Sequence, residues 1–331
     1  MKRTLMASLC IAGFMLGACS SEAANSSSGE WEPAKTVELV APSGAGGGWD
    51  TTARMVAKVI DEANLANKSF GVINKPGGGG AIGWADNYRR NDPHNIFVAS
   101  PPLIFIHLNE QSKYGFKDFT PLANLIADYG AFAVRADAKW DNLQELFDDL
   151  KKDPTAATVI GTSTPGSMAH MQFVQFAMEA GVDVKNVRYI TEQDGGAITS
   201  LLNGSVDVFS TSVSVAVDQA RAGKIKILGV TSSDRLQGDF LSDIPTVKEQ
   251  GYDAEFVNWR GVLGPPNMTD EQIHYYEKLF EKMLATEQFA EIQEQFGWNT
   301  MYLDSSEFTE FLEEQENDMD RLLKATGFKK E

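Results

Sequence analysis

The chain is poor in the side chains on which enzymes and disulfide-stapled secreted domains depend. Its 331 residues include only two cysteines, Cys10 and Cys19, and four histidines. No pair of histidines has a metal-ligand spacing such as His-Glu-x-x-His, and the sequence contains no Gly-x-Ser-x-Gly turn. These absences argue against a metallohydrolase, a serine hydrolase and a thiol enzyme.

Basic residues are scarce as well. The chain has 29 lysines and arginines against 46 aspartates and glutamates, which gives a formal net charge of −17. Such a charge repels nucleic acid and anionic lipid surfaces, so we expect no nucleic-acid partner. An acidic ligand would have to be held by local donors against the field of the whole protein.

A long hydrophobic run is missing too, and the one notable apolar stretch lies at the N-terminus. Lys2 and Arg3 precede the apolar residues 5–16, which are too few to span a bilayer as a mature helix. The stretch ends in Leu-Gly-Ala-Cys at 16–19, a sequence that resembles a bacterial lipobox. No other segment is long and apolar enough to cross a membrane.

These features predict how the N-terminus is processed. We expect a lipoprotein signal peptide over 1–18, a lipid-modified Cys19 and a small, polar tether over 19–30. An ordinary secretory signal cut near Ala24 is the alternative. Either cleavage places the protein outside the cytoplasm. With Cys19 acylated, no cysteine is left for a disulfide or a catalytic thiol.

Two glycine-rich turns are the most informative feature that is present. The first reads Pro-Ser-Gly-Ala-Gly-Gly-Gly-Trp-Asp over 42–50, and the second reads Lys-Pro-Gly-Gly-Gly-Gly-Ala-Ile-Gly over 75–83. Each stands between a strand-like and a helix-like run. Glycine lets backbone N–H groups face a ligand, and a helix start adds unpaired donors and partial positive charge. One such turn is more often only structural, but the pair favours a site that holds one small anion from both sides.

The second turn contains Gly-x-Gly-x-x-Gly at 78–83, yet the other features of a nucleotide site are absent from the sequence. A dinucleotide-binding fold needs an acidic residue at the end of the next strand. Here that strand ends in Ser-Pro-Pro at 100–102. Neither turn carries the Gly-Lys-Ser/Thr of a phosphate-binding P-loop. The sequence therefore disfavours nucleotide ligands.

Strand-like and helix-like runs alternate along the chain, which predicts an α/β architecture. Strands are expected at 37–41, 71–74, 95–100, 130–135, 157–161, 187–190, 206–210 and 226–231. Helices are expected over 53–63, from about 82, and over 142–152, 167–180, 195–203 and 214–222. The end of the chain is helical, with a capping box at Thr269 and Gln272 and two apolar stripes after it.

The element order predicts two domains of similar build. The first comprises 31–128 plus 262–331, and the second comprises 129–261. The second includes the crossover strands, with 130–135 running outward and 257–263 returning. We see no sequence repeat between the halves.

Polar turns in the second predicted domain repeat the logic of the glycine turns. They are Gly-Thr-Ser-Thr-Pro-Gly-Ser at 161–167, Gln-Asp-Gly-Gly at 193–196 and Ser-Thr-Ser at 210–212. All lie where the carboxyl ends of strands would meet, which is where ligands bind in open α/β sheets. His170, just inside a helix, is either a donor to the ligand or a structural histidine. Asp50 is placed like a helix N-cap.

Several short motifs, in their order and spacing, resemble those of a known family. They are Ala-Pro-Ser-Gly-Ala-Gly-Gly-Gly-Trp-Asp at 41–50, the glycine turn at 74–83, Leu-Leu-Asn-Gly-Ser-Val-Asp at 201–207, Leu-Gly-Val-Thr-Ser-Ser-Asp-Arg at 228–235, Ile-Pro-Thr-Val-Lys-Glu-Gln-Gly-Tyr at 244–252, Asn-Trp-Arg-Gly at 258–261 and Gly-Pro-Pro at 264–266. The chain resembles the extracytoplasmic solute-binding proteins of tripartite tricarboxylate transporters, the Bug/TctC family, over nearly the whole mature chain. The Asn-Trp-Arg-Gly element is most similar to the tricarboxylate branch.

The resemblance implies a fold and a binding site. The fold is a two-domain periplasmic-binding-protein fold of type II, a Venus flytrap with mixed sheets flanked by helices. The family holds a ligand carboxylate mainly through backbone N–H groups of the glycine loops, often with bridging waters. From the first domain it implies Ser43, Gly44, Ala45, Gly46, Gly47, Trp49, Asp50, Gly78, Gly79, Gly80, Ala81, Ile82 and Ser100. From the second it implies Thr162, Ser163, Thr164, His170, Asp194, Gly195, Gly196, Thr211 and Ser212.

The implied function is capture of a small carboxylate, citrate-like or a dicarboxylate, and its delivery to the membrane subunits of the transporter. We expect a monomer with a lipid anchor, no enzymatic activity, no cofactor and no metal. The stretch Tyr-Ile-Thr-Glu-Gln-Asp-Gly-Gly at 189–196 departs from the family pattern by its extra acids, which favours a ligand with a hydroxyl or amine opposite its carboxylate. The alternatives are a binder of an aromatic acid or amino acid, a ligand-presenting sensor subunit and an extracytoplasmic hydrolase.

Overall fold

The computed structural model describes residues 31–162, 167–192, 196–253 and 256–326, and these residues form one compact unit. The predicted signal peptide, tether and Cys19 lie outside them. The strands are β1 Val37–Ala41, β2 Phe70–Asn74, β3 Asn95–Ala99, β4 Thr120–Arg135, β5 Thr158–Thr162, β6 Arg188–Glu192, β7 Val208–Ser212, β8 Ile225–Val230, β9 Val257–Gly264 and β10 Asn299–Leu303. The α-helices are α1 Gly48–Glu62, α2 Ala81–Arg90, α3 Pro102–Leu108, α4 Leu143–Lys152, α5 Met168–Glu179, α6 Gly196–Leu202, α7 Val213–Arg221, α8 Asp270–Leu284, α9 Glu287–Phe296 and α10 Ser305–Thr326.

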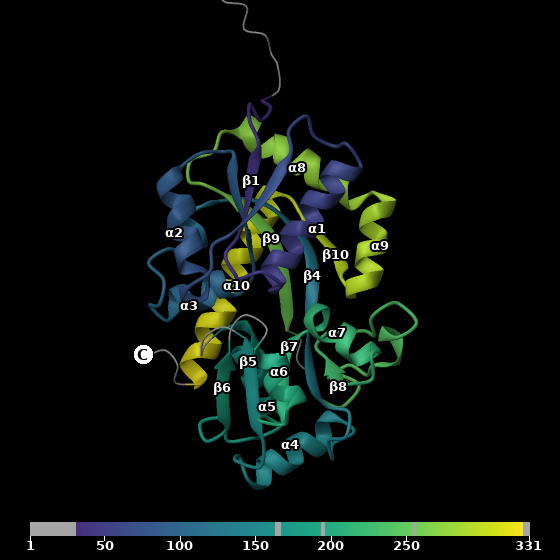
Figure 1. Cartoon of the computed structure of the whole chain (residues 1–331). Helices are drawn as coiled ribbons and strands as arrows, with labels where there is room; N and C mark the ends of the chain where they lie inside the picture. The colour runs from purple at the N-terminus through teal and green to yellow at the C-terminus, as the bar shows by residue number, and fades with distance from the viewer. Residues whose placement is uncertain (1–30, 163–166, 193–195, 254–255, 327–331) are drawn as a thin grey trace, which may run out of the picture. The chain divides into compact units, whose positions relative to one another are not determined.

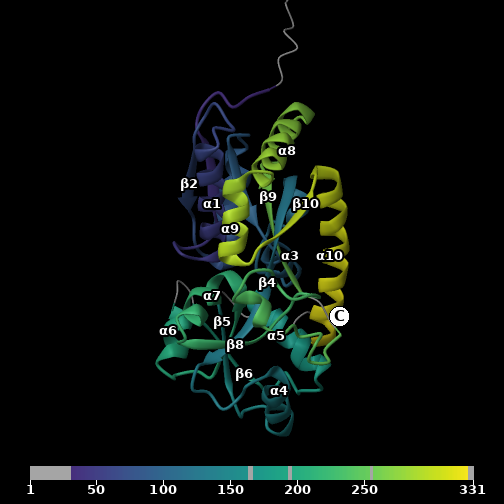
Figure 2. The ribbon, with the colours of Figure 1, turned by 90° about the vertical axis from the view of Figure 1, so that its right-hand side faces the viewer.

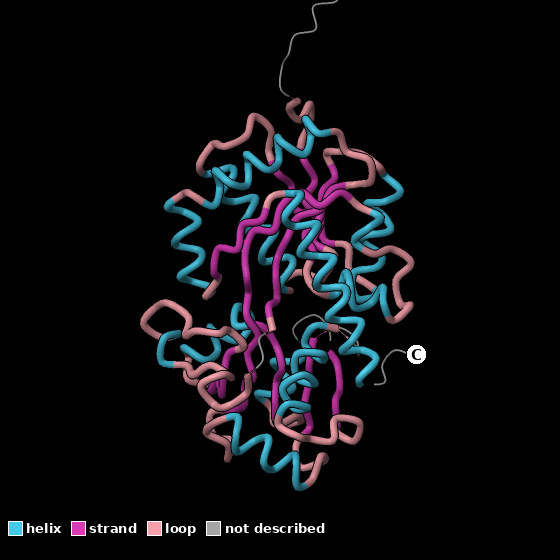
Figure 3. Tube along the Cα trace, turned by 180° about the vertical axis from the view of Figure 1, so that it is seen from behind, coloured by secondary structure: helices cyan, strands magenta, loops and turns pink. Residues whose placement is uncertain are grey.

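One mixed sheet of ten strands contains two groups of parallel strands. In the first group β1 lies between β2 and β3, and in the second β5 lies between β6 and β7, all parallel within their group. Antiparallel strands β9 and β4 connect the groups in the order β2-β1-β3-β9-β4-β7-β5-β6. The alternating strand and helix pattern therefore gave the right fold class, an α/β sheet of mixed direction with helices around it (Figure 3).

The long strand β4 carries the chain from one group to the other (Figure 1). Its residues 120–129 pair with β9, and its residues 130–135 pair with β7 and β8. The change of partner falls between Tyr129 and Gly130, where the sequence predicted the outward crossing. Strand β4 begins ten residues earlier than predicted, at Thr120 rather than Gly130.

The return of the chain differs from the expectation. Strand β9 pairs along its length with the first part of β4 and over 261–263 with β3, and Val257 already stands opposite Tyr129. The sequence placed 257–263 in the crossover itself. The return therefore lies before Val257, and β9 belongs to the group that contains β1.

Two of the elements that the sequence did not reveal in full are buried on all sides. Helix α3 was not predicted, and its residues Leu103 to Ile106 are buried. The middle of β4 is buried on both faces. Without an exposed face neither segment shows the periodicity of an amphipathic helix or a half-buried strand. The sequence also missed α9 and β10, which separate the two C-terminal helical stripes.

The C-terminal helices cover the part of the sheet that β9, β10 and the start of β4 form. Helix α10 contacts β4 and α3 (Figure 2). Trp259 of β9 is fully buried and lies edge-on to Phe308 and Phe311 of α10, with ring centroids 5.4 and 6.3 Å apart. The predicted capping box of α8 is confirmed, because Thr269 and Gln272 each bond to the other's backbone N–H.

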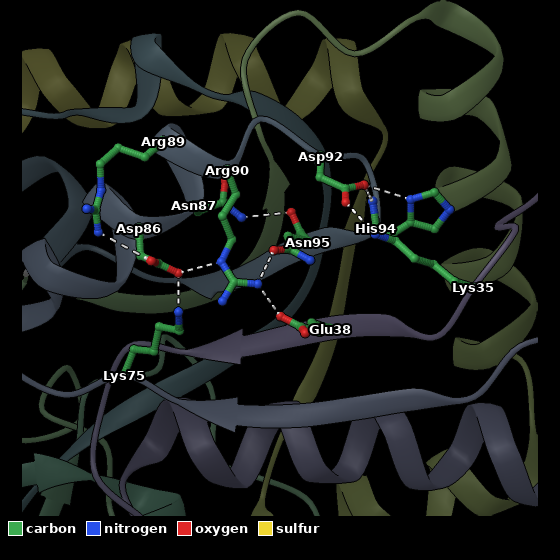
Figure 4. A network of polar contacts seen from close by, with 10 residues as sticks. All are labelled: Lys35, Glu38, Lys75, Asp86, Asn87, Arg89, Arg90, Asp92, His94 and Asn95. Atoms are coloured by element: carbon green, nitrogen blue, oxygen red, sulfur yellow. Dashed lines mark hydrogen bonds and ion pairs between the residues drawn. The ribbon is translucent and has the colours of Figure 1, made fainter.

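A network of charged side chains joins α2 to the edges of β1, β2 and β3 (Figure 4). Asp86 of α2 pairs with Lys75, which directly follows β2, and with Arg90 at 2.9 Å. Arg90 in turn reaches Glu38 of β1 at 2.6 Å. These ion pairs hold the start of the second glycine turn against α2.

The carboxylate of Asp92, in the same network, is expected to make the stability of the fold depend on pH. Burial alone would raise its pKa, but hydrogen bonds from Lys35 (2.7 Å) and from the backbone and ring of His94 (3.0 and 2.7 Å) lower the pKa to about 2. A carboxylate whose pKa is depressed in the folded state stabilises the fold at pH values above its unfolded-state pKa. That contribution is lost as the pH falls toward the folded-state pKa. We expect Asp92→Asn to reduce the free energy of unfolding by about 1 to 2 kcal/mol at pH 7.

Urea unfolding of the wild type and variant at pH 7 and at pH 3 measures this effect. The difference between the two proteins should shrink at the lower pH. The matched control is Asp137→Asn, since Asp137 forms an ion pair with Arg135 but is largely exposed, and it should change stability by less than about 1 kcal/mol. A difference for Asp92→Asn that is equal at both pH values would contradict the role of its ionised carboxylate.

Candidate functional site

A cavity of about 160 Å³ lies where the carboxyl ends of the two parallel groups face each other. The residues that line it from the first group follow β1, β2 and β3, and Arg260 comes from β9: Pro42, Ser43, Gly44, Gly46, Gly47, Gly48, Trp49, Pro76, Gly77, Gly79, Gly80, Ser100, Pro102 and Arg260. Those from the second group are Thr162, Ser167, Met168, Ala169, Ala197, Ile198, Phe209, Thr211, Ser212 and Val215. Ligands bind at this edge of open α/β sheets, so the cavity is the candidate site.

Four of the helices that begin at the cavity have an N-cap residue in its lining, and these four N-caps share one property. The N-cap residues of α1, α2, α5 and α7 are Gly47, Gly80, Ser167 and Ser212, and all four line the cavity. Within the described residues, none of these N-caps makes a side-chain capping bond. The first N–H groups of a helix have no partner inside it and carry partial positive charge. At α2 the preceding glycine turn already accepts hydrogen bonds from the N–H groups of Gly80, Ala81 and Ile82, so the starts of α1, α5 and α7 are the ones that direct such donors at the cavity.

Three helices that begin away from the cavity do have side-chain caps. Asn142 caps α4, Thr269 caps α8 and Thr286 caps α9, each by accepting a hydrogen bond from a backbone N–H of the first turn. A side-chain cap stabilises a helix by about 1 kcal/mol. The difference between the two sets of helices indicates that the donors at the cavity are left for a ligand.

Asp50 organises the first glycine turn. Its carboxylate accepts hydrogen bonds from the Gly46 N–H (2.9 Å), from Arg54 (3.0 Å) and from the Asn74 amide (2.8 Å). Gly46 has a φ of +79°, which only glycine adopts without strain. The turn therefore depends on a glycine for its shape and on a buried carboxylate for its position.

The predicted role of Asp50 as a helix N-cap was wrong. Helix α1 begins three residues earlier than that role requires, and its N-cap is Gly47. Asp50 stands in the first turn instead, where its carboxylate reaches back to the Gly46 N–H. Burial alone would raise the pKa of Asp50, but the hydrogen bonds from Arg54, Gly46 and Asn74 outweigh it and hold the pKa below its usual value.

The second glycine turn has a backbone conformation that residues other than glycine rarely adopt. Four consecutive residues, Gly77 to Gly80, have positive φ values between 59° and 122°. A Cβ atom on Gly80 would also lie 2.6 Å from the ring of Trp84, which is fully buried. Trp49 packs edge-on to that ring and donates its indole N–H to Ser100 at 2.9 Å. The two turns and the end of β3 thus share one tryptophan-supported wall.

The opposite wall combines hydroxyls with apolar side chains. Thr162, Thr211 and Ser212 end strands β5 and β7, and Ile198 and Val215 lie beside them in α6 and α7. Such a lining, mostly apolar with a few placed polar groups, is typical of small-molecule sites.

The structure places the predicted site residues in three sets. Eleven line the cavity: Ser43, Gly44, Gly46, Gly47, Trp49, Gly79, Gly80, Ser100, Thr162, Thr211 and Ser212. Seven described residues do not: Ala45, Asp50, Gly78, Ala81, Ile82, His170 and Gly196. Ser163, Thr164, Asp194 and Gly195 lie outside the described residues.

His170 lies in the core of the second group. It is buried in α5, and its ring packs against that of Tyr189, with centroids 4.0 Å apart and the ring planes tilted by 34°. Burial lowers the pKa of His170 to about 4, so the ring is neutral at pH 7. Of the two roles left open by the sequence, the packing favours the structural one.

Arg260 is the most important lining residue that the sequence did not identify. It belongs to the Asn-Trp-Arg-Gly motif, which was noted only for its resemblance to a family. A lone arginine in an apolar strand was the available signal, since a charged residue is rarely buried without a partner. The apolar lining residues were missed because their place depends on how the strands meet.

The described residues contain neither a membrane-spanning helix nor a cluster of metal ligands. No helix among them is long and apolar enough to span a membrane. The same residues contain no group of three or more His, Cys, Asp or Glu side chains arranged to hold a metal ion.

The fold is shared with several solved structures. The periplasmic binding protein BugD covers 90% of this chain and 100% of its own, with a TM-score of 0.80 at 24% identity. The MatC protein of Rhodopseudomonas palustris with bound malate gives a TM-score of 0.76 at 19% identity, over 88% and 100% of the two chains. A second R. palustris protein, with adipate, gives 0.80 at 20% identity, over 89% and 98%. These likenesses confirm the periplasmic-binding-protein fold.

Sequence comparisons identify the family. Protein BugT of Bordetella pertussis is 26% identical over 249 residues, which are 73% of each chain. A protein from the tcbD-tcbE intergenic region of a Pseudomonas species is 25% identical over 279 residues, 81% of this chain and 79% of its own. The family model described as the tripartite tricarboxylate transporter family receptor, TctC, matches residues 53–328. The chain therefore belongs to the TctC family of tripartite tricarboxylate transporter receptors.

Proposed function

We propose that this protein captures a small carboxylate outside the cytoplasm and delivers it to the membrane subunits of a tripartite tricarboxylate transporter. The observation that carries the proposal is the convergence of four helix N-termini without side-chain caps on one cavity. Carboxylates accept hydrogen bonds from such N–H groups and are stabilised by the helix dipole. The membership in a receptor family supports the same function.

The volume of the cavity limits the size of the ligand. At about 160 Å³ it holds roughly ten water-sized spheres, which corresponds to a small organic acid. Structures of the same fold were solved with malate and with adipate. A dicarboxylate or a compact tricarboxylate is therefore the ligand class that we propose for this chain.

We further propose that the residues around β1 and those around β5 act as two domains that close on the ligand. Both walls supply donors, so only a closed arrangement satisfies all of them. A lipid on Cys19 would keep the protein at the membrane surface, where its transporter lies. The placement of the cavity supports the closure, and the Leu-Gly-Ala-Cys sequence at 16–19 supports the lipid anchor.

A thermal-shift panel tests the function. The purified protein is heated with dicarboxylates, tricarboxylates, aromatic acids and amino acids in turn. A ligand at about a hundred times its Kd stabilises the native state by roughly 2.7 kcal/mol. We expect a clear increase in Tm with at least one small di- or tricarboxylate and none with its diamide. An unchanged Tm with every carboxylate would overturn the proposal.

A further inference from the structure

Arg260 of β9 carries the charge among the described residues that line the cavity. Its side chain is 5% exposed, yet it lines the cavity. Every other described residue of the lining is uncharged. Burying a guanidinium is costly unless it is paired. A buried cation in a cavity whose other described residues are uncharged is therefore a candidate to contact an anionic ligand.

The partner of Arg260 is Asp128, near the change of partner in β4. Its carboxylate accepts from the Arg260 Nη2 at 3.0 Å, from Ser214 at 2.9 Å and from Asn258 at 3.3 Å. All three donors bond to the same oxygen, Oδ2. The other oxygen, Oδ1, is buried and has no hydrogen-bond partner in the described part of the chain. Asp128 thus neutralises Arg260 through one contact only.

The guanidinium also lies against the start of α1. A Cβ atom on Gly48 would be 2.5 Å from the Arg260 Nη2 and 3.2 Å from its Cζ. The first hydrogen bond of α1 runs from the Thr51 N–H to the Gly47 carbonyl. The N–H groups of residues 48–50 therefore have no partner within the helix. Arg260 therefore extends an existing set of anion donors with a full positive charge.

Two polar atoms at this place lack partners. The Arg260 Nε and the hydroxyl of Ser43, which lines the cavity in the first glycine turn, are buried and make no hydrogen bond to any residue that the structure describes. Leaving a buried donor unsatisfied costs about 1 to 3 kcal/mol. Such groups in a native protein call for an explanation, and a bound anion is one that fits their chemistry.

We propose that Arg260 binds a carboxylate of the ligand together with the first turn of α1, and that Asp128 sets the strength of this contact. The inference rests on the proposed function and names the side chain that makes the site selective for ionised acids. Without a ligand, Asp128 balances the charge of Arg260. With a ligand, two carboxylates share one guanidinium, so the negative charge of Asp128 opposes binding while it keeps Arg260 in place.

This arrangement predicts opposite effects for the two members of the ion pair. Arg260→Gln should weaken binding of the acid found in the thermal-shift panel by about tenfold to a hundredfold, the value of a hydrogen bond to a charged group. Asp128→Asn should strengthen binding by about tenfold, because it removes the competing charge. Arg260→Lys should fall between Arg260→Gln and the wild type, since a lysine keeps the charge but loses the planar fork.

Isothermal titration calorimetry of the wild type and of each variant measures these changes. The control is Arg321→Gln, a matched change at a largely exposed arginine that pairs with Asp318, and it should leave Kd unchanged. An Arg260 with only a structural role would make Arg260→Gln and Asp128→Asn weaken binding alike, and that result would overturn the inference. If Asp128→Asn does not fold, equal Kd values for Arg260→Gln and the wild type would overturn it.

The outcomes also separate this inference from the proposed function. A wild-type protein that binds no carboxylate contradicts the proposed function itself. A wild type that binds a carboxylate with the same Kd as Arg260→Gln contradicts only the role of Arg260. A lower Kd for Asp128→Asn beside a higher Kd for Arg260→Gln supports both.

Discussion

Replacing Gly48 with valine is expected to abolish carboxylate binding while the protein stays folded. Gly48 is the first residue of α1 and lines the cavity. Its φ is not in the left-handed region, so a side chain causes no backbone strain. A Cβ atom there would lie 2.5 Å from the Arg260 Nη2, and a valine would also block the approach of a ligand to the helix N-terminus. We expect Kd to rise by more than about a hundredfold.

The matched control is Gly71→Val. Gly71 is in β2, away from the cavity, and a Cβ there would meet only the Thr36 methyl at an ordinary 3.7 Å. This variant should bind the same acid with the Kd of the wild type. Calorimetric titration of both variants gives the comparison. A Gly48→Val protein that keeps its affinity within about threefold would show that the start of α1 is not a wall of the binding site.

Replacing Asp50 with alanine is expected to cause the largest loss of stability. The carboxylate is 3% exposed and joins the first glycine turn to α1 and to the end of β2. Its removal takes away the side-chain acceptor of the Gly46 N–H. Among the described residues, it leaves the Asn74 amide with only Ser43 O (3.0 Å) and Arg54 with only Asn74 Oδ1 (3.1 Å) as acceptors. Because hydrogen bonds to a charged group are worth more than neutral ones, we expect the free energy of unfolding to fall by about 2 to 4 kcal/mol.

Urea unfolding at pH 7 measures the loss, and Asp50→Asn is the conservative comparison. An asparagine keeps the shape and one acceptor oxygen, so it should lose less than alanine. The pKa of Asp50 is depressed in the folded state, so its contribution is present above the unfolded-state pKa and disappears as pH falls below it. The alanine variant should therefore differ least from the wild type in acid. Equal stability of alanine variant and wild type at pH 7 would refute the role of Asp50.

The first wall of the site was predictable from the sequence because its signals are local. Gly46 and the run from Gly77 to Gly80 have positive φ values that few other residues adopt. A glycine cluster between a strand and a helix therefore indicates both the turn and the helix start. Trp49 and Ser100 follow from their places next to the turn and at the end of β3.

The rest of the site depends on contacts between distant segments. Arg260 enters the cavity only because β9 lies between β3 and β4, a pairing of strands far apart in the chain. Local sequence shows that Arg260 stands in an apolar run but not that Asp128 faces it. In the same way, the sequence shows that His170 has a ring that can donate a hydrogen bond to a ligand. Only the packing of α5 on Tyr189 shows that this ring is buried.

The caps of the helices show how sequence and structure together identify the site. A sequence can reveal a capping residue such as Thr269. A missing side-chain cap suggests a ligand site only when the structure shows where the helix begins and what it faces. Here the helices that begin without side-chain caps at Gly47, Gly80, Ser167 and Ser212 line one cavity. The candidate site is therefore identified by the shared position of these helix starts rather than by any single motif.

The most direct test is a crystal structure of the protein with the acid that gives the largest thermal shift. We expect one carboxylate of the ligand within hydrogen-bond distance of the N–H groups at the start of α1 and of the Arg260 guanidinium. We also expect contacts of the ligand with Thr211 or Ser212 on the opposite wall. A ligand bound outside the cavity, or one bound inside it with its carboxylates directed away from α1 and Arg260, would contradict this binding mode.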